Sequence, residues 1–258
     1  PSIFSSTIFD YKQCCTRLKE AAFLIKGLKI DLIDERSGQS DTFFFQSGIV
    51  EYINDINKSK NPITEPIFLE GTGNGIQIEA VLQYTEKTNE NILSFVNNIR
   101  TKDGGTHETG FKSGLTRAFN DYARMKGLLK DKDPNLEGID IRDGMTAVIS
   151  LRVPEHLLQF EGQTKNKLGT AEAKTAVETL VAEKFGFYLA EKGEIANTLI
   201  NKTIKIAKAR EEARLIKENA RMQKQKTTKP ANLVGKLAPT QVKDGSRNEL
   251  FIVEGDSA

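Results

Sequence analysis

The sequence predicts an α+β fold in which helices cover one side of a β-sheet. Short stretches of alternating apolar residues, typical of strands, are interleaved with longer stretches whose apolar residues recur at helical spacing. Clusters of Gly, Asn and Pro separate these stretches and indicate turns. Hydrophobic residues make up 38% and charged residues 28% of the 258 residues, which is the ordinary mixture of a globular domain with a core.

The N-terminal quarter predicts a helix, a hairpin and a second, shorter helix. Residues 10–26 repeat apolar side chains near helical spacing and are followed by Gly27, which suits the C-terminal end of a helix. Two strands, 28–35 and 42–46, are separated by turn residues and therefore predict a β-hairpin. A short helix follows over 48–57.

The middle of the chain predicts most of the sheet and one long helix. That helix spans 107–129, with Thr106 as its N-terminal cap, and a polar loop follows it over 131–143. The predicted strands are 67–70, 76–85, 92–99 and 145–153.

Two further helices are predicted near the C-terminus. The first, 171–190, has a continuous apolar face. The second, 195–226, loses its apolar face and becomes strongly charged, which is typical of a connector outside a core. A Pro- and Gly-containing linker over 227–244 precedes a short apolar strand, 250–253. We therefore expect three parts: 1–194, 195–245 and 246–258.

Charge and cysteine usage exclude little but favour a cytoplasmic protein. The net charge of +2 is too small to indicate a nucleic-acid partner by itself. Cys14 and Cys15 are adjacent and point apart on a helix, so free thiols in a reducing compartment are expected. No membrane span or signal peptide is visible. The start at Pro1 and the end at Ala258 suggest cuts through a longer protein.

The polar loop 160–169 is the first candidate site. It follows a strand, precedes a helix, and contains Gln163, Thr164, Lys165 and Lys167. A lysine ammonium is a compact charge suited to a phosphate oxygen. From spacing alone, however, a solvated polar loop is the favoured interpretation.

The segment 97–108 is the second candidate. It includes a Gly104-Gly105 pair, which permits a tight backbone path, and His107. His107 is a candidate general base, but no nucleophile is predicted beside it. We therefore favour a structural or capping histidine.

Two further patterns have chemical potential. Glu254 and Asp256 follow the last apolar strand and are suitable oxygen ligands for Mg²⁺, although acidic turns after strands are common. The basic helix suits contacts to a DNA backbone, but its interspersed glutamates fit a solvated surface equally well. Its candidate contact residues are Lys205, Lys208, Arg210, Arg214, Lys217 and Arg221.

Six stretches in the same order resemble the B subunits of bacterial type IIA DNA topoisomerases, the family of DNA gyrase and topoisomerase IV. Each stretch alone is weakly specific, whereas all six in register across nearly the whole chain are strongly so. They are residues 4–11, 21–27, 95–99 with 104–107, 144–150, the Gln163-Thr164-Lys165 motif, and 249–258. Residues 100–110 and 160–165 favour topoisomerase IV over gyrase.

The resemblance implies a fold and a division of roles. Residues 1–194 would form a transducer domain like domain 2 of ribosomal protein S5. Residues 195–245 would form a connector, and 246–258 the first strand of a metal-binding toprim domain. Lys165 would contact the γ-phosphate of ATP, with Gln163 nearby, and Glu254 would bind Mg²⁺ and act in DNA cleavage.

The resemblance also implies partners and rivals. ATP and Mg²⁺ would be cofactors. The partners would be the topoisomerase A subunit, in an A2B2 assembly, a second B subunit and double-stranded DNA, in a cytoplasmic, nucleoid-associated enzyme. The main ATP pocket and the Asp-x-Asp metal ligands would lie outside this chain, which alone would be inactive. The rivals are DNA gyrase B, a non-catalytic nucleic-acid-binding module of the same fold, and a mismatch-repair or heat-shock ATPase.

Overall fold

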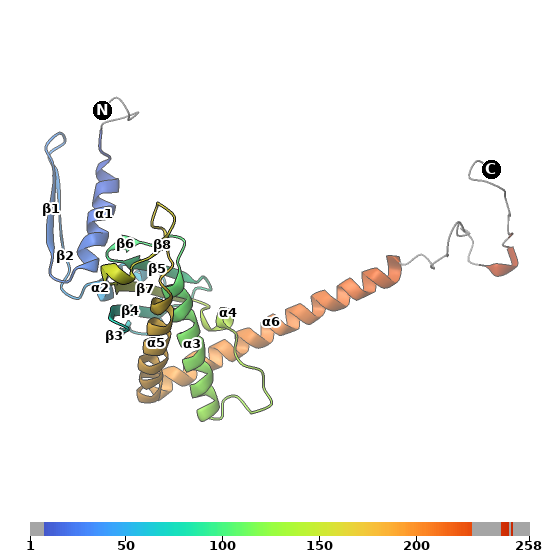
Figure 1. Cartoon of the computed structure of the whole chain (residues 1–258). Coiled ribbons are helices and arrows are strands. Elements are labelled where there is room, and N and C mark those ends of the chain that lie inside the picture. The colour runs from blue at the N-terminus through green and yellow to red at the C-terminus, as the bar shows by residue number, and fades with distance from the viewer. Residues whose placement is uncertain (1–7, 229–243, 248, 250–258) are drawn as a thin grey trace. The chain divides into compact units, whose positions relative to one another are not determined.

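The computed structural model describes residues 8–228, 244–247 and 249. The chain divides into two compact units, Pro1–Ala207 and Lys208–Ala258. The first unit contains every strand of the described chain and supplies the geometry of the site (Figure 1).

The order of elements is mixed α and β. The α-helices are α1 (Tyr11–Leu24), α2 (Ile49–Asn57), α3 (Thr106–Met125), α4 (Gly138–Ile141), α5 (Ala171–Glu191) and α6 (Gly193–Thr228). The strands are β1 (Lys29–Asp34), β2 (Gln39–Phe44), β3 (Ile67–Gly73), β4 (Ile76–Tyr84), β5 (Asn91–Val96), β6 (Ile99–Arg100), β7 (Met145–Arg152), β8 (Phe160–Glu161) and β9 (Lys167–Leu168). Two 3₁₀ turns, η1 (Glu155–Leu157) and η2 (Gly245–Arg247), complete them.

A five-stranded sheet in the order β3-β4-β7-β5-β6 forms the centre of the first unit. Only the β5–β7 pair is parallel, and the other neighbours are antiparallel. The separate two-stranded sheets β1–β2 and β8–β9 lie outside it. The α+β class predicted from the sequence is confirmed.

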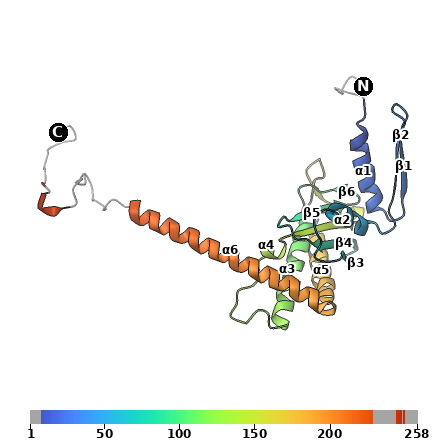
Figure 2. The ribbon, with the colours of Figure 1, turned by 180° about the vertical axis from the view of Figure 1, so that it is seen from behind.

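Helices α3 and α5 pack side by side on one face of this sheet (Figures 1 and 2). Gly110 and Gly114 of α3 allow the close approach, because an added Cβ would meet the α5 backbone at Lys174 and Glu178. Phe119 of α3 stacks on Phe185 of α5 with ring centroids 5.6 Å apart. Full burial of such side chains stabilises the fold by about 1.5–3 kcal/mol each.

The opposite face of the sheet is covered as well, by α2 and the end of α1. Ile49, Tyr52 and Ile53 of α2 pack with Val81 of β4 and Val148 of β7. The expectation that helices cover only one side was therefore wrong. Apolar side chains on both faces of strand β4 are buried, as expected for a strand that is covered on both sides.

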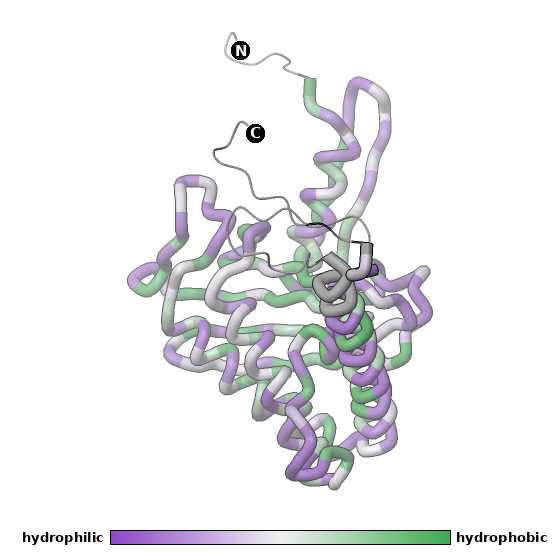
Figure 3. Tube along the Cα trace, turned by 90° about the vertical axis from the view of Figure 1, so that its right-hand side faces the viewer, coloured by the Kyte–Doolittle hydropathy of each residue, from purple (hydrophilic) through white to green (hydrophobic). Residues whose placement is uncertain are grey.

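Helix α1 and the β1–β2 hairpin form an outlying pair of elements (Figure 3). Tyr11 Oη donates a hydrogen bond of 2.8 Å to Asp41 Oδ2, which connects the start of α1 to β2. The hairpin is mostly hydrophilic, and even its apolar Ile33 is 68% exposed. Cys14 and Cys15 on α1 are free thiols, as predicted.

Several helices and strands begin or end at other residues than the sequence predicts. Strand β2 begins at Gln39, three residues before the predicted start, and α3 ends at Met125 rather than at residue 129. The predicted loop 131–143 contains the short helix α4. Thr106 is the first residue of α3, and Gly105 occupies the cap position without a side-chain hydrogen bond. Thr106 Oγ1 instead donates to the carbonyl of Thr170 at 2.6 Å.

The C-terminal helices are two separate helices, as predicted. Helix α5 ends at Glu191 and α6 begins at Gly193. In the second unit, every described side chain from residue 211 to 221 is exposed. None of the described helices is long and apolar enough to cross a membrane.

Candidate functional site

The loop that carries Gln163 and Lys165 is the tip of a small β-hairpin. Strands β8 and β9 pair in antiparallel register, with Phe160 opposite Leu168, and residues 162–166 connect them. Gln163 and Lys165 are both exposed at this tip. The hairpin itself lies near the β8 label in Figure 1. The sequence predicted a solvated polar loop here; the segment is exposed, but it forms a β-hairpin.

The base of the hairpin is fixed to the start of α3. Asp103 N donates to Asn166 O at 3.0 Å, and Leu168 N donates to Gly104 O at 3.1 Å. Gly105 pairs with Leu168 in a parallel bridge. A Cβ at Gly105 would collide with the backbone of Leu168, so only glycine allows this approach. The base of the hairpin is therefore fixed by backbone hydrogen bonds, whereas its tip is exposed.

Lys165 has an unusual backbone conformation. Five non-glycine residues among those described have positive φ, and four of them are asparagines; the fifth is Lys165, at φ 55°. Asparagine tolerates this region, whereas a lysine there costs about 1 kcal/mol. Residues held in such conformations cluster at functional sites.

The two lysines of the hairpin differ in their surroundings. Lys167 Nζ pairs with Glu161 Oε2 at 2.8 Å, and this hydrogen bond raises the pKa of Lys167. Within the described residues no carboxylate pairs with Lys165, whose Nζ lies 6.0 Å from the Phe160 ring centroid. Of the two hairpin lysines, Lys165 is therefore the one whose ammonium group can donate hydrogen bonds to a ligand.

His107 is a structural residue, as favoured from the sequence. Its side chain is fully buried, and burial lowers its pKa to about 4. Its Nε2 lies 3.1 Å from Thr101 Oγ1, and its Nδ1 has no hydrogen-bond partner among the described residues. A neutral, enclosed imidazole of this kind has no path to a substrate.

A hollow of about 400 Å³ lies between the hairpin base and the first turns of α3. Its basic side chains are balanced by acidic ones: Lys112 lies 3.6 Å from Glu108, and Lys167 is paired with Glu161. This balance leaves no excess positive charge for an anion inside the hollow. The exposed tip remains the better candidate for phosphate contact.

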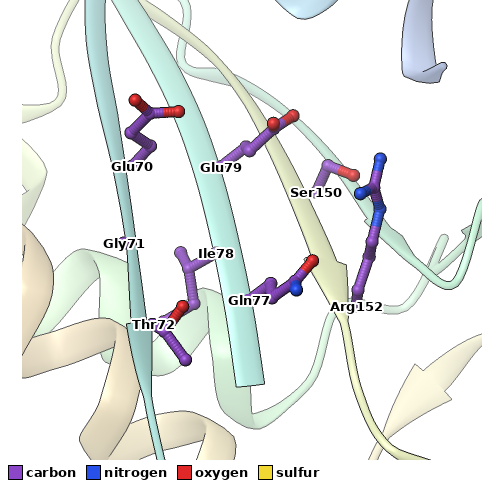
Figure 4. A pocket seen from close by; sticks show the side chains of 8 residues that line it. All are labelled: Glu70, Gly71, Thr72, Gln77, Ile78, Glu79, Ser150 and Arg152. Atoms are coloured by element: carbon purple, nitrogen blue, oxygen red, sulfur yellow. The ribbon is translucent and has the colours of Figure 1, made fainter. Parts of the chain in front are cut away.

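A second hollow, of about 340 Å³, lies on the sheet face that α2 partly covers (Figure 4). Its polar lining comes from β3, β4 and β7, and includes Glu70, Glu79 and Arg152. Glu79 already pairs with Lys26 at 3.2 Å. This hollow was not indicated by any motif in the sequence.

The basic side chains of α6 up to Arg221, where burial is described, are exposed or half-buried. Arg214 is held by Glu211 through bonds of 3.0 and 2.7 Å, so part of the basic surface is internally compensated. Lys205, Lys208, Lys217 and Arg221 are exposed, and Arg210 is half-buried. This geometry fits a solvated surface helix as well as one that contacts DNA phosphates.

The candidate metal ligand Glu254 and the predicted strand 250–253 lie outside the described residues. Among the residues that are described, no group of three or more His, Cys, Asp or Glu side chains is arranged to hold a metal ion.

Sequence reasoning missed the polar residues beneath the hairpin. Ser94 of β5 donates to Glu108 Oε1 at 2.6 Å and lies 2.6 Å from Thr101 Oγ1. A serine within an otherwise apolar strand was the available signal. Its partners, seven and fourteen residues further along the chain, belong to other elements, so the contact itself was not predictable from the pattern.

Comparison with known proteins agrees with this architecture. The family model described as DNA gyrase B matches residues 48–219. The chain is 50% identical over its whole length to the B subunit of DNA topoisomerase 4 from Bacillus subtilis, and it covers 39% of that protein. It is also 50% identical over its whole length to the corresponding protein of Enterococcus faecalis, of which it covers 38%. The chain thus spans well under half the length of these relatives.

Solved structures give the same result. The 43K ATPase domain of Thermus thermophilus gyrase B, in complex with an aminocoumarin, is 36% identical with a TM-score of 0.74. The match covers 84% of this chain and 58% of that one. The topoisomerase IV ATP-binding domain of Francisella tularensis is 26% identical with a TM-score of 0.69, covering 80% and 56%. From the family model, the whole-length identity and the shared fold together, we conclude that the chain belongs to the DNA gyrase B family.

Proposed function

We propose that the chain is the transducer part of the B subunit of topoisomerase IV, an ATP-dependent type II DNA topoisomerase. Identity of 50% to the DNA topoisomerase 4 B subunits of two bacteria supports this choice. In the proposal, residues 1–194 form an S5-domain-2-like transducer, 195–245 a connector, and 246–258 the start of a toprim domain.

The proposed task of the chain is to sense the γ-phosphate of ATP. Lys165 donates a charge-assisted hydrogen bond to it, with Gln163 nearby, while other parts of the protein hold the rest of the nucleotide. One observation carries this role. Lys165 is exposed at the tip of a hairpin whose base is fixed, and no described carboxylate pairs with it.

Sensing follows from the loss of that bond when the γ-phosphate leaves. A hydrogen bond to a charged group contributes about 1.5–3 kcal/mol. Two orientations of the transducer that differ by this contact would change population when ATP is hydrolysed, since a ligand shifts an equilibrium by its differential affinity. The connector would pass that change to the DNA-cleaving part of the enzyme.

The remaining roles are proposed from the resemblance to the family alone. Glu254 would bind Mg²⁺ and act in cleavage with the A subunit, in an A2B2 assembly on double-stranded DNA in the cytoplasm, where the enzyme would separate linked chromosomes. Lys205, Lys208, Arg210, Arg214, Lys217 and Arg221 are candidate contacts to DNA phosphates. The alternative is the B subunit of DNA gyrase, which would introduce negative supercoils rather than separate catenated DNA.

The test uses the full-length protein. Steady-state ATP turnover is measured for wild type, Lys165→Ala and Lys167→Ala, with nucleotide binding measured separately. Lys165→Asn is added because asparagine tolerates positive φ, which separates loss of the ammonium from a change in backbone strain. We expect strongly reduced turnover with binding retained for both Lys165 variants, and near-normal turnover for Lys167→Ala.

Equal turnover in wild type and both Lys165 variants would exclude the sensing role and favour a non-catalytic module. The choice between topoisomerase IV and gyrase is tested by mixing the full-length protein with its A subunit and supplying catenated or relaxed DNA. Decatenation without supercoiling is expected, whereas efficient supercoiling would identify a gyrase.

A further inference from the structure

A continuous chain of buried polar side chains lies directly beneath the hairpin. It connects His107 and Glu108 of α3, Thr101 of the preceding loop and Ser94 of β5. Ser94, Thr101 and His107 are each 0–2% exposed, and the Glu108 side chain is 17% exposed. Buried polar networks are costly unless every member is paired, so the directions of these bonds matter.

The direction of each bond follows from the carboxylate at one end. Glu108 only accepts hydrogen bonds, and Ser94 Oγ lies 2.6 Å from its Oε1, closer than the 3.2 Å to Thr101 O. The single hydroxyl proton of Ser94 therefore points to Glu108. Ser94 Oγ then accepts the hydroxyl proton of Thr101 across 2.6 Å, since the other acceptor within reach of Thr101 Oγ1, Ser94 O, is further away at 3.1 Å.

Thr101 Oγ1 donates its proton to Ser94 and can therefore only accept a hydrogen bond from His107 Nε2, which lies 3.1 Å away. His107 must therefore carry its proton on Nε2 and leave Nδ1 bare, which agrees with the absence of a described partner at Nδ1. All three bonds point the same way, from His107 through Thr101 and Ser94 to Glu108. We call these four residues the relay.

The relay holds the loop to which the hairpin is attached. Thr101 is also bonded to β5 through its backbone, with Thr101 N donating to Ser94 O at 2.9 Å, and Gly104 N donates to Thr101 O at 3.0 Å. The next backbone groups, Asp103 N and Gly104 O, are those that bond Asn166 and Leu168 of the hairpin. The path from the relay to the hairpin therefore consists of consecutive residues and direct hydrogen bonds.

Glu108 is positioned to terminate the relay. It lies in the first turn of α3, where a negative charge is favoured by the helix dipole. A Cβ at Gly104 would lie 2.9 Å from the Glu108 carboxylate, so this side chain packs directly against the loop. Lys112 Nζ lies 3.6 Å from Glu108 Oε2, which leaves Oε1 for the relay.

We propose that the relay of His107, Thr101, Ser94 and Glu108 is a set of positioning residues that fixes the hairpin base and so sets the reach of Lys165 toward a nucleotide phosphate. This inference rests on the proposed function of Lys165. In this proposal the relay residues act on the nucleotide only through the loop and the hairpin. A displacement of about 1 Å in a positioned group costs up to about a hundredfold in rate.

The test compares variants that break the relay with variants that keep it, in the full-length protein. Thr101→Val and Ser94→Ala remove a hydroxyl with little change of volume. Thr101→Ser keeps the hydroxyl, and His107→Gln places an amide N–H near the position of Nε2. Each is assayed for kcat and KM of ATP hydrolysis beside Lys165→Ala, and hydrogen exchange is followed in peptides that cover 101–107 and 157–169.

The expected result is faster exchange in both peptides for Thr101→Val and Ser94→Ala, with kcat lowered about tenfold or more and KM changed less than about threefold. Thr101→Ser and His107→Gln should recover most of the wild-type kcat and exchange. If Thr101→Val fails to fold, Ser94→Ala still tests the relay, because this substitution removes only one hydroxyl group.

Two outcomes are distinguishable. Wild-type kcat and exchange in Ser94→Ala and Thr101→Val, beside an impaired Lys165→Ala, would overturn the relay as a positioning device. Unimpaired turnover in Lys165→Ala would instead overturn the proposed function, while exchange would still report whether the relay holds the hairpin.

Discussion

The side chain of Asn97 forms a reciprocal pair of hydrogen bonds with the backbone of Val153. Asn97 Oδ1 accepts from Val153 N at 2.8 Å, and Asn97 Nδ2 donates to Val153 O at 3.0 Å. Asn97 thus extends the β5–β7 pairing by one residue beyond the end of β7. Val153 lies just before the segment that leads into the β8–β9 hairpin, so this pair fixes the direction in which that segment leaves the sheet.

Replacing Asn97 should therefore cost more than replacing its neighbour. Both Asn97 and Asn98 have positive φ, so an alanine at either position loses the same backbone preference. Only Asn97→Ala also loses the two bonds to Val153, which should lower the free energy of unfolding by about 1–3 kcal/mol more than Asn98→Ala. Denaturant unfolding of the two variants measures the difference, and equal values would exclude a stabilising role for the pair.

Gly105 should be the least replaceable glycine of the site. It has φ 141°, and an added Cβ would meet the backbone of Leu168. Gly162, at the hairpin tip, also has positive φ but open space around it. We expect Gly105→Ala to lower the unfolding free energy by about 2–4 kcal/mol and Gly162→Ala by about 1 kcal/mol. A smaller loss in Gly105→Ala than in Gly162→Ala would contradict the fixed base.

The buried His107 should make stability depend on pH. Its folded-state pKa of about 4 lies below the ordinary value of 6.5, so the unfolded chain binds more protons between these values. The associated stability is fully present above about pH 6.5 and is lost as the pH falls toward about 4. From pH 7.5 to 5 the loss attributable to His107 should be about 2 kcal/mol.

The variant His107→Gln separates this effect from other titrations. It should have a shallower dependence of unfolding free energy on pH than wild type. Identical slopes in wild type and His107→Gln would show that His107 does not titrate as its burial requires.

Contact of α6 with DNA should appear in the salt dependence of binding. Each phosphate contact contributes about 0.9 to the slope of log affinity against log salt concentration. The double variant Lys208→Gln/Lys217→Gln should therefore reduce the slope by about 1.8 in the full-length protein with its A subunit. Lys58→Gln/Lys132→Gln makes the same change of charge elsewhere and should leave the slope unchanged; equal slopes in both double variants would favour a solvated helix.

The sequence predicts the helices and strands well where their periodicity is strong. Helix α5 and strand β7 agree with the prediction within one residue at each end because their apolar patterns are long and regular. The coverage of both sheet faces was missed, although Val81 between Ile78 and Leu82 was a sign of burial on both sides of β4. An amphipathic pattern shows that α2 has an apolar face, but not which side of the sheet that face covers.

The sequence located the candidate site but did not predict the structure that supports it. The Gln163-Thr164-Lys165 motif located the exposed tip, but its hairpin strands are only two residues long and have no recognisable alternation. Residue preference favours Thr106 as a helix cap, whereas tertiary contact with Thr170 determines its actual bond. The relay joins residues from three separate elements, and only the folded chain brings them together.

The proposed contact of Lys165 with the γ-phosphate is tested most directly by the ratio of dissociation constants for ADP and a non-hydrolysable ATP analogue. The ratio is measured on the full-length protein for wild type, Lys165→Ala and Lys167→Ala. Loss of a charge-assisted hydrogen bond should reduce the preference for the ATP analogue by about tenfold to a hundredfold in Lys165→Ala alone. An unchanged ratio in Lys165→Ala would contradict the contact and, with it, the proposed role of the hairpin.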